Sequence, residues 1–378
     1  MTTVQANPDI SRSFKEIVTQ NGFKFEEHLV TTKDGYILHM FRIPGLQSEG
    51  ETNGAKKVIY FQHGILDSAD CWIMHKSQFA PAFIASRAGY DVWLGNTRGN
   101  KYSKDHQGSI SNYDRWNYDF EVMGDLDITA EIEYALKVTG QKKLAYIGHS
   151  QGTSQMYYAL SHNEDFFAER VSVFVALGPV MQLTHCKSSL INFFATFESL
   201  IVNSASLIGF YEFFPAGWVT TGAMRLLCGT IPQLCEFGLY LITDEDPSLN
   251  DADRTPVYLG HFPSGTSLRS LDHYGQILNS KRFQRMDYGS SKNKQIYGEN
   301  TAPLINLQNI KKVPIAMFVG TSDQLATVED NRWAKTQLST LTHYKEYALG
   351  HLSFMIAKDM SYFTTDVMNI LHQYHPAN

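Results

Sequence analysis

The sequence predicts an α/β protein whose core is a mostly parallel sheet, with a mostly helical insertion late in the chain. Short apolar runs that end at a glycine or a turn residue alternate with helix-like segments up to about residue 182. The alternation resumes after residue 300, whereas the stretch between is rich in aromatic residues and leucine and lacks this rhythm. Strands that alternate with helices indicate βαβ units. We therefore expect a core of residues 1–182 and 301–378 and a cap domain with a lid at 183–300.

The chain begins with a predicted antiparallel hairpin. Two β-rich runs in "FEEHLVTTKDGYILHMFRI" (25–43) lie on either side of Asp34 and Gly35, a strong hairpin signal. The elements expected next are a strand in "VIYFQHG" (58–64), a helix near 75–87, and a strand in "YDVWLG" (90–95). A helix over 119–139 follows, with apolar residues at three-and-four spacing and a stop at Gly140.

The same rhythm predicts the remaining core. The elements are the strand "KLAYI" (143–147), the helix "SQMYYALSH" (154–162), the strand "VSVFVALG" (171–178), the strands in "VPIAMFVGTSD" (313–323) and "HYKEYALGH" (343–351), and a final helix near 361–374. The insertion therefore falls between the sixth and seventh core strands, where a cap over the carboxyl ends of the strands is its natural role.

Composition excludes several classes of function. The formal net charge is −6, from 32 basic and 38 acidic residues, and the absence of a basic block argues against a nucleic-acid partner. No run of 18 apolar residues exists, so no transmembrane segment is expected. The chain also lacks the metal-binding and nucleotide-binding motifs, and we expect neither a metal nor another cofactor.

The four cysteines and the first residues bear on the compartment. Four cysteines are too few for a disulfide scaffold; free thiols are the default, and a local bridge between Cys228 and Cys235 is the alternative. The polar start "MTTVQANPDISRSF" lacks the apolar core of a secretory signal. The chain is thus expected to be either cytoplasmic or a processed form of a longer protein.

The segment "YIGHSQG" (146–152) is the first candidate for chemistry. Ser150 stands between Gly148 and Gly152, which fits either a tight turn or the nucleophile elbow G-x-S-x-G. A predicted strand precedes this serine and a predicted helix follows it, which is the context that the elbow requires. In parallel sheets, ligands bind beyond the carboxyl ends of the strands, and Ser150 lies at such an end.

A serine nucleophile needs a base, a group that orients the base, and donors for the oxyanion. Asp323 and His351 each follow a predicted strand, and the order Ser150, Asp323, His351 is that of the α/β-hydrolase fold. Taken alone, Asp323 could simply cap a turn or helix, and His351 could be one of the 14 histidines placed there by chance. Because both residues occur in the right order and place, a catalytic triad explains the two together better. The expected oxyanion donors are the backbone N–H groups of Gln151 and Ile65.

These residues resemble the acid lipases, the family of gastric lipases and lysosomal acid lipase. The resemblance covers nearly the whole chain and is carried in order by "GYILHMFRIP", "FQHGIL", "AGYDVWLGNTRGN", "YIGHSQGT", "ALGPV", "GHFPSGTS", "FQRMDYGSS" and "GHLSF". It implies hydrolysis of triacylglycerols and sterol esters without a cofactor, under a helical cap with a movable lid, in a secreted or lysosome-like compartment. Ser150, Asp323 and His351 match the family's triad, and Ile65 and Gln151 match its oxyanion donors.

One departure from the family lies in the cap. Cys228 matches the second half of the family's cap disulfide, but position 219 is valine, so that bridge is absent. Cys235 approximates a third cap cysteine with altered spacing.

The aromatic residues of the cap do not by themselves determine the substrate. They fit either a pocket for a long acyl chain, with contact at a lipid-water interface, or a packed hydrophobic minidomain. The expected function is a lipase, with a short-chain or aromatic-ester esterase and a lipid-binding protein as the alternatives. The aromatic residues are Phe193, Phe194, Phe197, Phe210, Tyr211, Phe213, Phe214 and Trp218.

Overall fold

The computed structural model describes residues 7–50, 56–196, 209–215 and 243–377, and within them nine strands form one central sheet. The order along the sheet is β1-β2-β4-β3-β6-β7-β10-β11, with β5 paired to β2. Pairs from β4 onward are parallel, and those of β1, β2 and β5 are antiparallel. The mostly parallel sheet is therefore confirmed. Its strands are β1 (Glu26–Thr31), β2 (Tyr36–Ile43), β3 (Val58–Gln62), β4 (Asp91–Leu94), β5 (Asp105–His106), β6 (Leu144–His149), β7 (Val171–Leu177), β10 (Ile315–Gly320) and β11 (Leu341–Tyr347).

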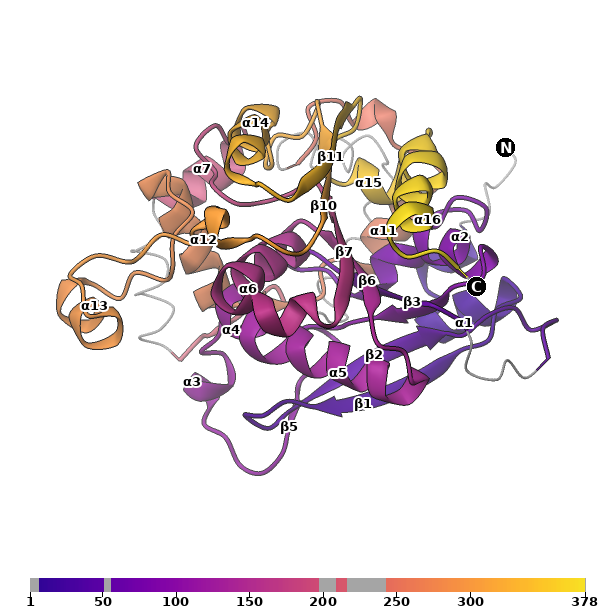
Figure 1. Cartoon of the computed structure of the whole chain (residues 1–378), viewed down its shortest axis with the longest axis horizontal. Coiled ribbons are helices and arrows are strands. Elements are labelled where there is room, and N and C mark those ends of the chain that lie inside the picture. The colour runs from indigo at the N-terminus through magenta and orange to yellow at the C-terminus, as the bar shows by residue number, and fades with distance from the viewer. Residues whose placement is uncertain (1–6, 51–55, 197–208, 216–242, 378) are drawn as a thin grey trace, which may run out of the picture.

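Helices cover both faces of this sheet (Figure 1). Alternate residues of a strand point to opposite faces, and here Ile59 and Phe61 of β3 join one buried cluster while Val58 and Tyr60 join the other. The core helices are α1 (Phe14–Gln20), α2 (Pro81–Arg87), α3 (Asn112–Arg115), α4 (Phe120–Val122), α5 (Ile128–Thr139), α6 (Gln151–Ala168), α14 (Val328–Gln337), α15 (Ser353–Ile356) and α16 (Met368–Tyr374).

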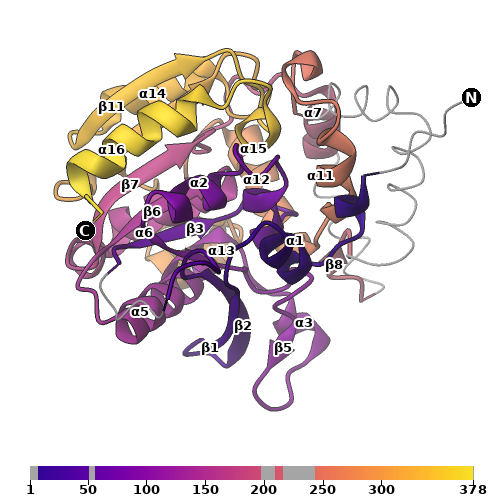
Figure 2. The same ribbon diagram turned by 90° about the vertical axis from the view of Figure 1, so that its right-hand side faces the viewer.

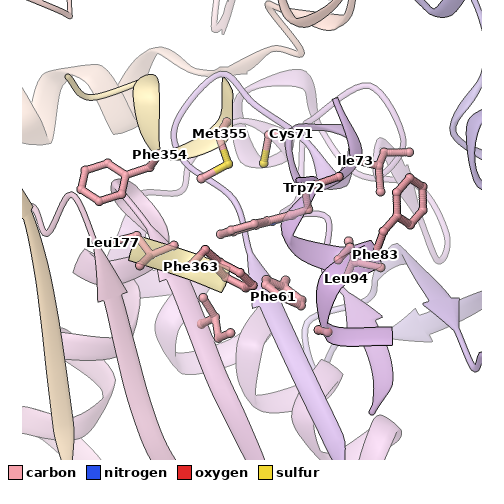
Figure 3. Packing of buried hydrophobic residues seen from close by; sticks show 14 of the residues in the cluster. Phe61, Cys71, Trp72, Ile73, Phe83, Leu94, Leu177, Phe354, Met355 and Phe363 are labelled. Atoms are coloured by element: carbon pink, nitrogen blue, oxygen red, sulfur yellow. The ribbon is translucent and has the colours of Figure 1, made fainter. Parts of the chain in front are cut away.

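The buried cluster that contains Ile59 and Phe61 extends from β3 to α2 and the C-terminal helices. Phe61 contacts Trp72, with ring centroids 4.7 Å apart, and Phe363 lies on the same side of the sheet (Figure 3). Phe354, from the short helix α15, packs in the same cluster. This cluster thus links the first half of the chain to the segment that follows β11.

The predicted hairpin is confirmed, but the helix predicted at 75–87 is too long. Only Pro81–Arg87 is helical, after a separate 3₁₀ turn at Ala69–Ile73. Proline suits the first turn of a helix because it lacks an N–H group, and it favours an extended conformation in the residue before it. Ala80 is extended, with φ −65° and ψ 124°, so the helix begins at the proline.

The helix predicted at 119–139 is confirmed with one irregularity. A π-helical turn at Met123–Asp127 joins α4 to α5, and Gly140 ends the helix in the left-handed conformation, with φ 68°. The final helix also begins with a π-helical turn, at Tyr362–Val367.

The insertion between β7 and β10 is mostly helical where it is described. It contains α7 (Ser189–Thr196), α11 (Thr255–His261), α12 (Leu268–Ser280) and α13 (Ser290–Tyr297), with a small sheet of β8 (Glu212–Phe213) and β9 (Thr266–Ser267). In Figure 2, α7, α11 and α12 lie toward the end of the molecule to which the arrow of β7 points. The cap boundaries, 183 and 300, stay a prediction. Val219, Cys228, Cys235 and the side chains of Phe193, Phe194, Phe197 and Trp218 lie outside the described residues.

Candidate active site

Ser150 occupies a strained turn between β6 and α6. Its backbone has φ 51° and ψ −119°, a region that side chains other than glycine rarely adopt, and its N–H donates to the carbonyl of Leu177 (3.1 Å). The flanking glycines serve close packing. A Cβ on Gly152 would lie 2.4 Å from the carbonyl oxygen of Gln62, and one on Gly148 would lie 2.8 Å from that of Gly152. The turn therefore has the structure of a nucleophile elbow.

His351 and Asp323 form a hydrogen-bonded chain with this serine. His351 Nε2 lies 2.8 Å from Ser150 Oγ, and His351 Nδ1 lies 2.7 Å from Asp323 Oδ2. The three residues are buried, with exposed fractions of 6% for Ser150 and 3% for each partner. They come from the loops after β6, β10 and β11. The structure thus brings the three predicted residues together, with His351 between Ser150 and Asp323 as predicted.

The second oxygen of Asp323 is also engaged. Its Oδ1 accepts the backbone N–H groups of Leu325 and Ala326, both at 2.8 Å. These bonds hold the carboxylate in place, so that Oδ2 stays directed at His351. With Nδ1–H donating to Asp323, Nε2 is left to accept the serine proton.

The environment of His351 favours its protonated form. Burial lowers the pKa of the imidazole, but the charge and the hydrogen bond of Asp323, together with the charge of Asp244, outweigh burial and raise it. A raised pKa makes His351 a stronger base toward the serine hydroxyl, and it also means that the ring protonates before an ordinary histidine as the pH falls.

The loop after β3 lies directly against Ser150. A Cβ on Gly64 would lie 3.0 Å from Ser150 Cβ and 3.5 Å from Ser150 Oγ. Within the described part of the chain, the N–H groups of Ile65 and Gln151 donate to no acceptor, so both are free for a ligand. Their assignment as oxyanion donors stays a proposal.

His63 braces this loop, a role that the sequence did not reveal. Its Nδ1 donates to the carbonyl of Gly64 (2.7 Å), and its Nε2 accepts the N–H of Thr97 (3.2 Å). Burial lowers the pKa of His63 to about 4, so the ring is neutral and can play both parts. Thr97 belongs to the segment "GNTRGN" (95–100), so this segment helps to hold the loop of Gly64 through His63.

Two further buried residues near His351 were not predicted. His149 Nε2 lies 2.9 Å from the carbonyl oxygen of His351, and burial lowers its pKa well below the usual range. Asp244 accepts the N–H of Leu352 (3.1 Å). Neither has a local motif, because their partners are distant in sequence.

One cluster in the described residues could by composition hold a cation: Asp119, Glu121 and His273. Its carboxylates are already paired, Asp119 with Arg269 (Nε at 2.9 Å) and Glu121 with Arg285 (Nε at 2.6 Å). We therefore interpret the cluster as an ion-pair network that joins α4 to the insertion.

A strained serine after a parallel strand, with a histidine and an aspartate in this order, is the arrangement of the serine hydrolases with an α/β-hydrolase fold. The family model described as "alpha/beta hydrolase fold" matches residues 57–357, and that of the "partial alpha/beta-hydrolase lipase region" matches 14–76. The chain is 35% identical to the gastric triacylglycerol lipase of Bos taurus over 94% of this chain and 90% of that one. It is 33% identical to the lysosomal acid lipase/cholesteryl ester hydrolase of Homo sapiens, over 97% and 92%.

The chain therefore belongs to the α/β-hydrolase family of gastric and lysosomal acid lipases. Among solved structures, a soluble variant of monoglyceride lipase from Saccharomyces cerevisiae is similar, with a TM-score of 0.51 and 15% identity over 93% of both chains. At that identity the likeness shows the fold alone.

Proposed function

We propose that the protein is a serine ester hydrolase of the lipase type, which cleaves acylglycerols and sterol esters through an acyl-enzyme. The observation that carries this proposal is the hydrogen-bonded chain from Ser150 Oγ through His351 to Asp323 at the strained elbow.

The reaction follows from the geometry. Ser150 Oγ attacks the ester carbonyl carbon while His351 Nε2 takes the serine proton, and Asp323 stabilises the imidazolium. The N–H groups of Ile65 and Gln151 stabilise the oxyanion of the tetrahedral intermediate. The intermediate collapses as His351 gives its proton to the departing alcohol. Water then attacks the acyl-enzyme with His351 again as base, and the fatty acid leaves.

Two observations support a lipid substrate. The relatives are named as a triacylglycerol lipase and a cholesteryl ester hydrolase. In the described part of the insertion, Phe210 and Phe214 are 45% and 47% exposed, and Tyr211 contacts the half-exposed Tyr113, with ring centroids 5.5 Å apart. Exposed aromatic rings gathered in this way favour contact with an apolar surface. The cap at 183–300 would thus meet the lipid-water interface through this segment.

The compartment is part of the proposal. Because one relative is named gastric and another lysosomal, we place the protein in a secreted or lysosome-like compartment. Among the described helices, none is long and apolar enough to cross a membrane.

A chain-length series tests this function. Hydrolysis of p-nitrophenyl esters from acetate to palmitate, and of emulsified triacylglycerol, is measured for the wild type, Ser150→Ala and Ser161→Ala. Ser161 is the matched control, because it lies on the same helix α6 and its hydroxyl only donates to the carbonyl of Tyr158. Ser150→Ala should lower turnover by about 10⁵-fold or more with unchanged circular dichroism, and Ser161→Ala should not.

The outcomes separate the candidates. Activity that extends to palmitate and rises at the emulsion surface supports the lipase. Activity confined to acetate and butyrate would support a short-chain or aromatic-ester esterase. A folded wild type that binds fatty acid without any turnover would support a lipid-binding protein and contradict the enzyme.

A further inference from the structure

A second buried carboxylate lies beside the catalytic histidine, and the reaction described above does not use it. Asp244 belongs to the insertion and is fully buried. It forms a backbone bridge with Asp323, and on either side Gln324 N donates to Thr243 O (3.0 Å) and Glu245 N donates to Ser322 O (2.8 Å). The segment around Asp244 therefore runs antiparallel to the loop that carries Asp323.

The side chain of Asp244 turns to the histidine loop. Its Oδ1 accepts the N–H of Leu352 (3.1 Å), and its Oδ2 accepts the side-chain amide of Asn250 (3.0 Å). A Cβ on Gly350 would lie 2.4 Å from Asp244 Cγ. The carboxylate thus lies against the backbone on both sides of His351, and the absence of a side chain at position 350 is what admits it.

The same segment holds the far end of the histidine loop. Asn250 bridges to Ala357, Asp251 N donates to Ile356 O (2.8 Å), and Lys358 N donates to Leu249 O (2.9 Å). The insertion therefore contacts the chain from Gly350 to Lys358 at both ends, and Asp244 is the charged group at the end that carries His351.

We propose that Asp244 is a positioning residue for His351: its carboxylate holds the histidine loop through Leu352 N–H and adds a second negative charge that stabilises the imidazolium formed during acyl transfer. This inference rests on the proposed function, since it assigns His351 the role of base.

The charged groups around Asp244 and His351 are consistent with this role. The titratable groups that face His351 are Asp323, Asp244 and the neutral His149. Together with burial, the charge of Asp244 also raises the pKa of Tyr258 of α11. Both oxygens of Asp244 accept N–H groups, which favours the ionised form. Burial raises the pKa of Asp244, and the charge of Asp323 adds to that rise, so Asp244 takes up a proton before an ordinary aspartate as the pH falls.

The substitution Asp244→Asn separates charge from structure. It keeps the volume and an oxygen for Leu352 N–H. The new amide would face the amide nitrogen of Asn250, but Asn250 Oδ1 has no partner among the described atoms, so rotation of the Asn250 amide restores a hydrogen bond. Glu245→Gln is the matched control, because Glu245 is the exposed neighbouring acid.

The test is the rate at which a fluorophosphonate labels the active-site serine, measured against pH. Labelling needs neutral His351, so the midpoint of the acidic limb reports the pKa of that residue. Asp244→Asn should move the midpoint to lower pH and reduce the limiting rate by about tenfold, whereas Glu245→Gln should change neither. An unmoved midpoint in folded Asp244→Asn, whether or not the rate falls, would overturn the inference. A folded wild type that is not labelled would instead contradict the proposed function.

A second pair of variants serves if Asp244→Asn does not fold. Gly350→Ala should displace the carboxylate, lower the unfolding temperature and lower the midpoint. Adding Asp244→Gly makes room for the methyl group, so the double variant should recover unfolding temperature while its midpoint stays low. A double variant with the wild-type midpoint would overturn the role of the Asp244 charge.

Discussion

Ser150 holds a backbone conformation that is costly for a residue with a side chain, with φ 51°. Such strain persists only where the surroundings impose it. Here the N–H of Ser150 donates to Leu177 O. Gly148 lets the two sides of the turn pack closely, and Gly152 and Gly64 let the end of β3 and the loop after it lie against the turn. The surrounding contacts, and not the conformational preference of Ser150 itself, therefore direct the serine hydroxyl toward His351.

Gly64→Ala should greatly lower kcat while the fold survives. The added Cβ would lie 3.0 Å from Ser150 Cβ, so the loop of Ile65 has to move away from the serine. Loss of one oxyanion donor lowers kcat by about a hundredfold or more. Steady-state kinetics with a soluble ester checks this, and Gly108→Asn, at a glycine with no neighbour within 4 Å, is the control. An unchanged kcat in Gly64→Ala would exclude this loop from the oxyanion hole.

At this scale, the sequence predicted the residues that have local motifs. The elbow is recognisable from five consecutive residues, and Asp323 and His351 follow from their places after strands. His149 and Asp244 were missed because their contacts are long-range: Asp244 and Leu352 are 108 residues apart in the chain. His63 was missed because one of its two partners, Thr97, is 34 residues away. Nothing near Asp244 in the sequence indicates that it faces Gly350.

Between elements, the buried hydroxyl of Tyr60 joins β3 to α5. Tyr60 Oη lies 2.5 Å from both Glu131 Oε2 and Gln62 Oε1, and a phenol has one proton to donate. A protonated Glu131 resolves this, since it donates to Tyr60 while Tyr60 donates to Gln62. Burial raises the pKa of Glu131 well above its usual range, in agreement with that arrangement. Gln62 ends the strand that leads to the loop of Gly64, so this chain of bonds supports the site.

Glu131→Gln should alter the pH dependence of stability. An acid whose pKa is raised on folding contributes stability below its unfolded pKa and loses it as the pH rises through the folded value. Glutamine keeps the shape and donates to Tyr60 at every pH. The free energy of unfolding of Glu131→Gln, relative to the wild type, should therefore increase from acidic to alkaline pH. Urea titrations across that range check this, and a difference independent of pH would show that Glu131 is ionised in the folded protein.

Some element boundaries were predicted wrongly from the sequence, and these errors have local physical causes. The helix predicted at 75–87 begins only at Pro81, and the helix predicted at 154–162 belongs to a longer one that begins at Gln151. Apolar spacing identifies the middle of a helix, whereas caps and the elbow decide its ends. The π-helical turn at Met123–Asp127 has no signature in apolar spacing and was not predicted.

In the molecule as a whole, buried charges tie the described part of the insertion to the core. Asp119 pairs with Arg269 of α12, Glu121 pairs with Arg285, and His261 of α11 lies 2.7 Å from Asp70. Removing one partner of such a pair leaves an uncompensated buried charge, so a substitution at any of these residues should destabilise the contact between the two parts. The insertion is thus bound to the core through polar contacts and reaches the active site through Asp244.

The central claim is that distant loops of one chain combine to make Ser150 a nucleophile. The most direct measurement is the mass of the intact protein after reaction with a fluorophosphonate, followed by mapping of the modified peptide, for wild type and His351→Ala. One adduct per chain on Ser150 in the wild type, and almost none in folded His351→Ala, is the predicted result. A folded wild type without an adduct, or with the adduct on another residue, would contradict the account.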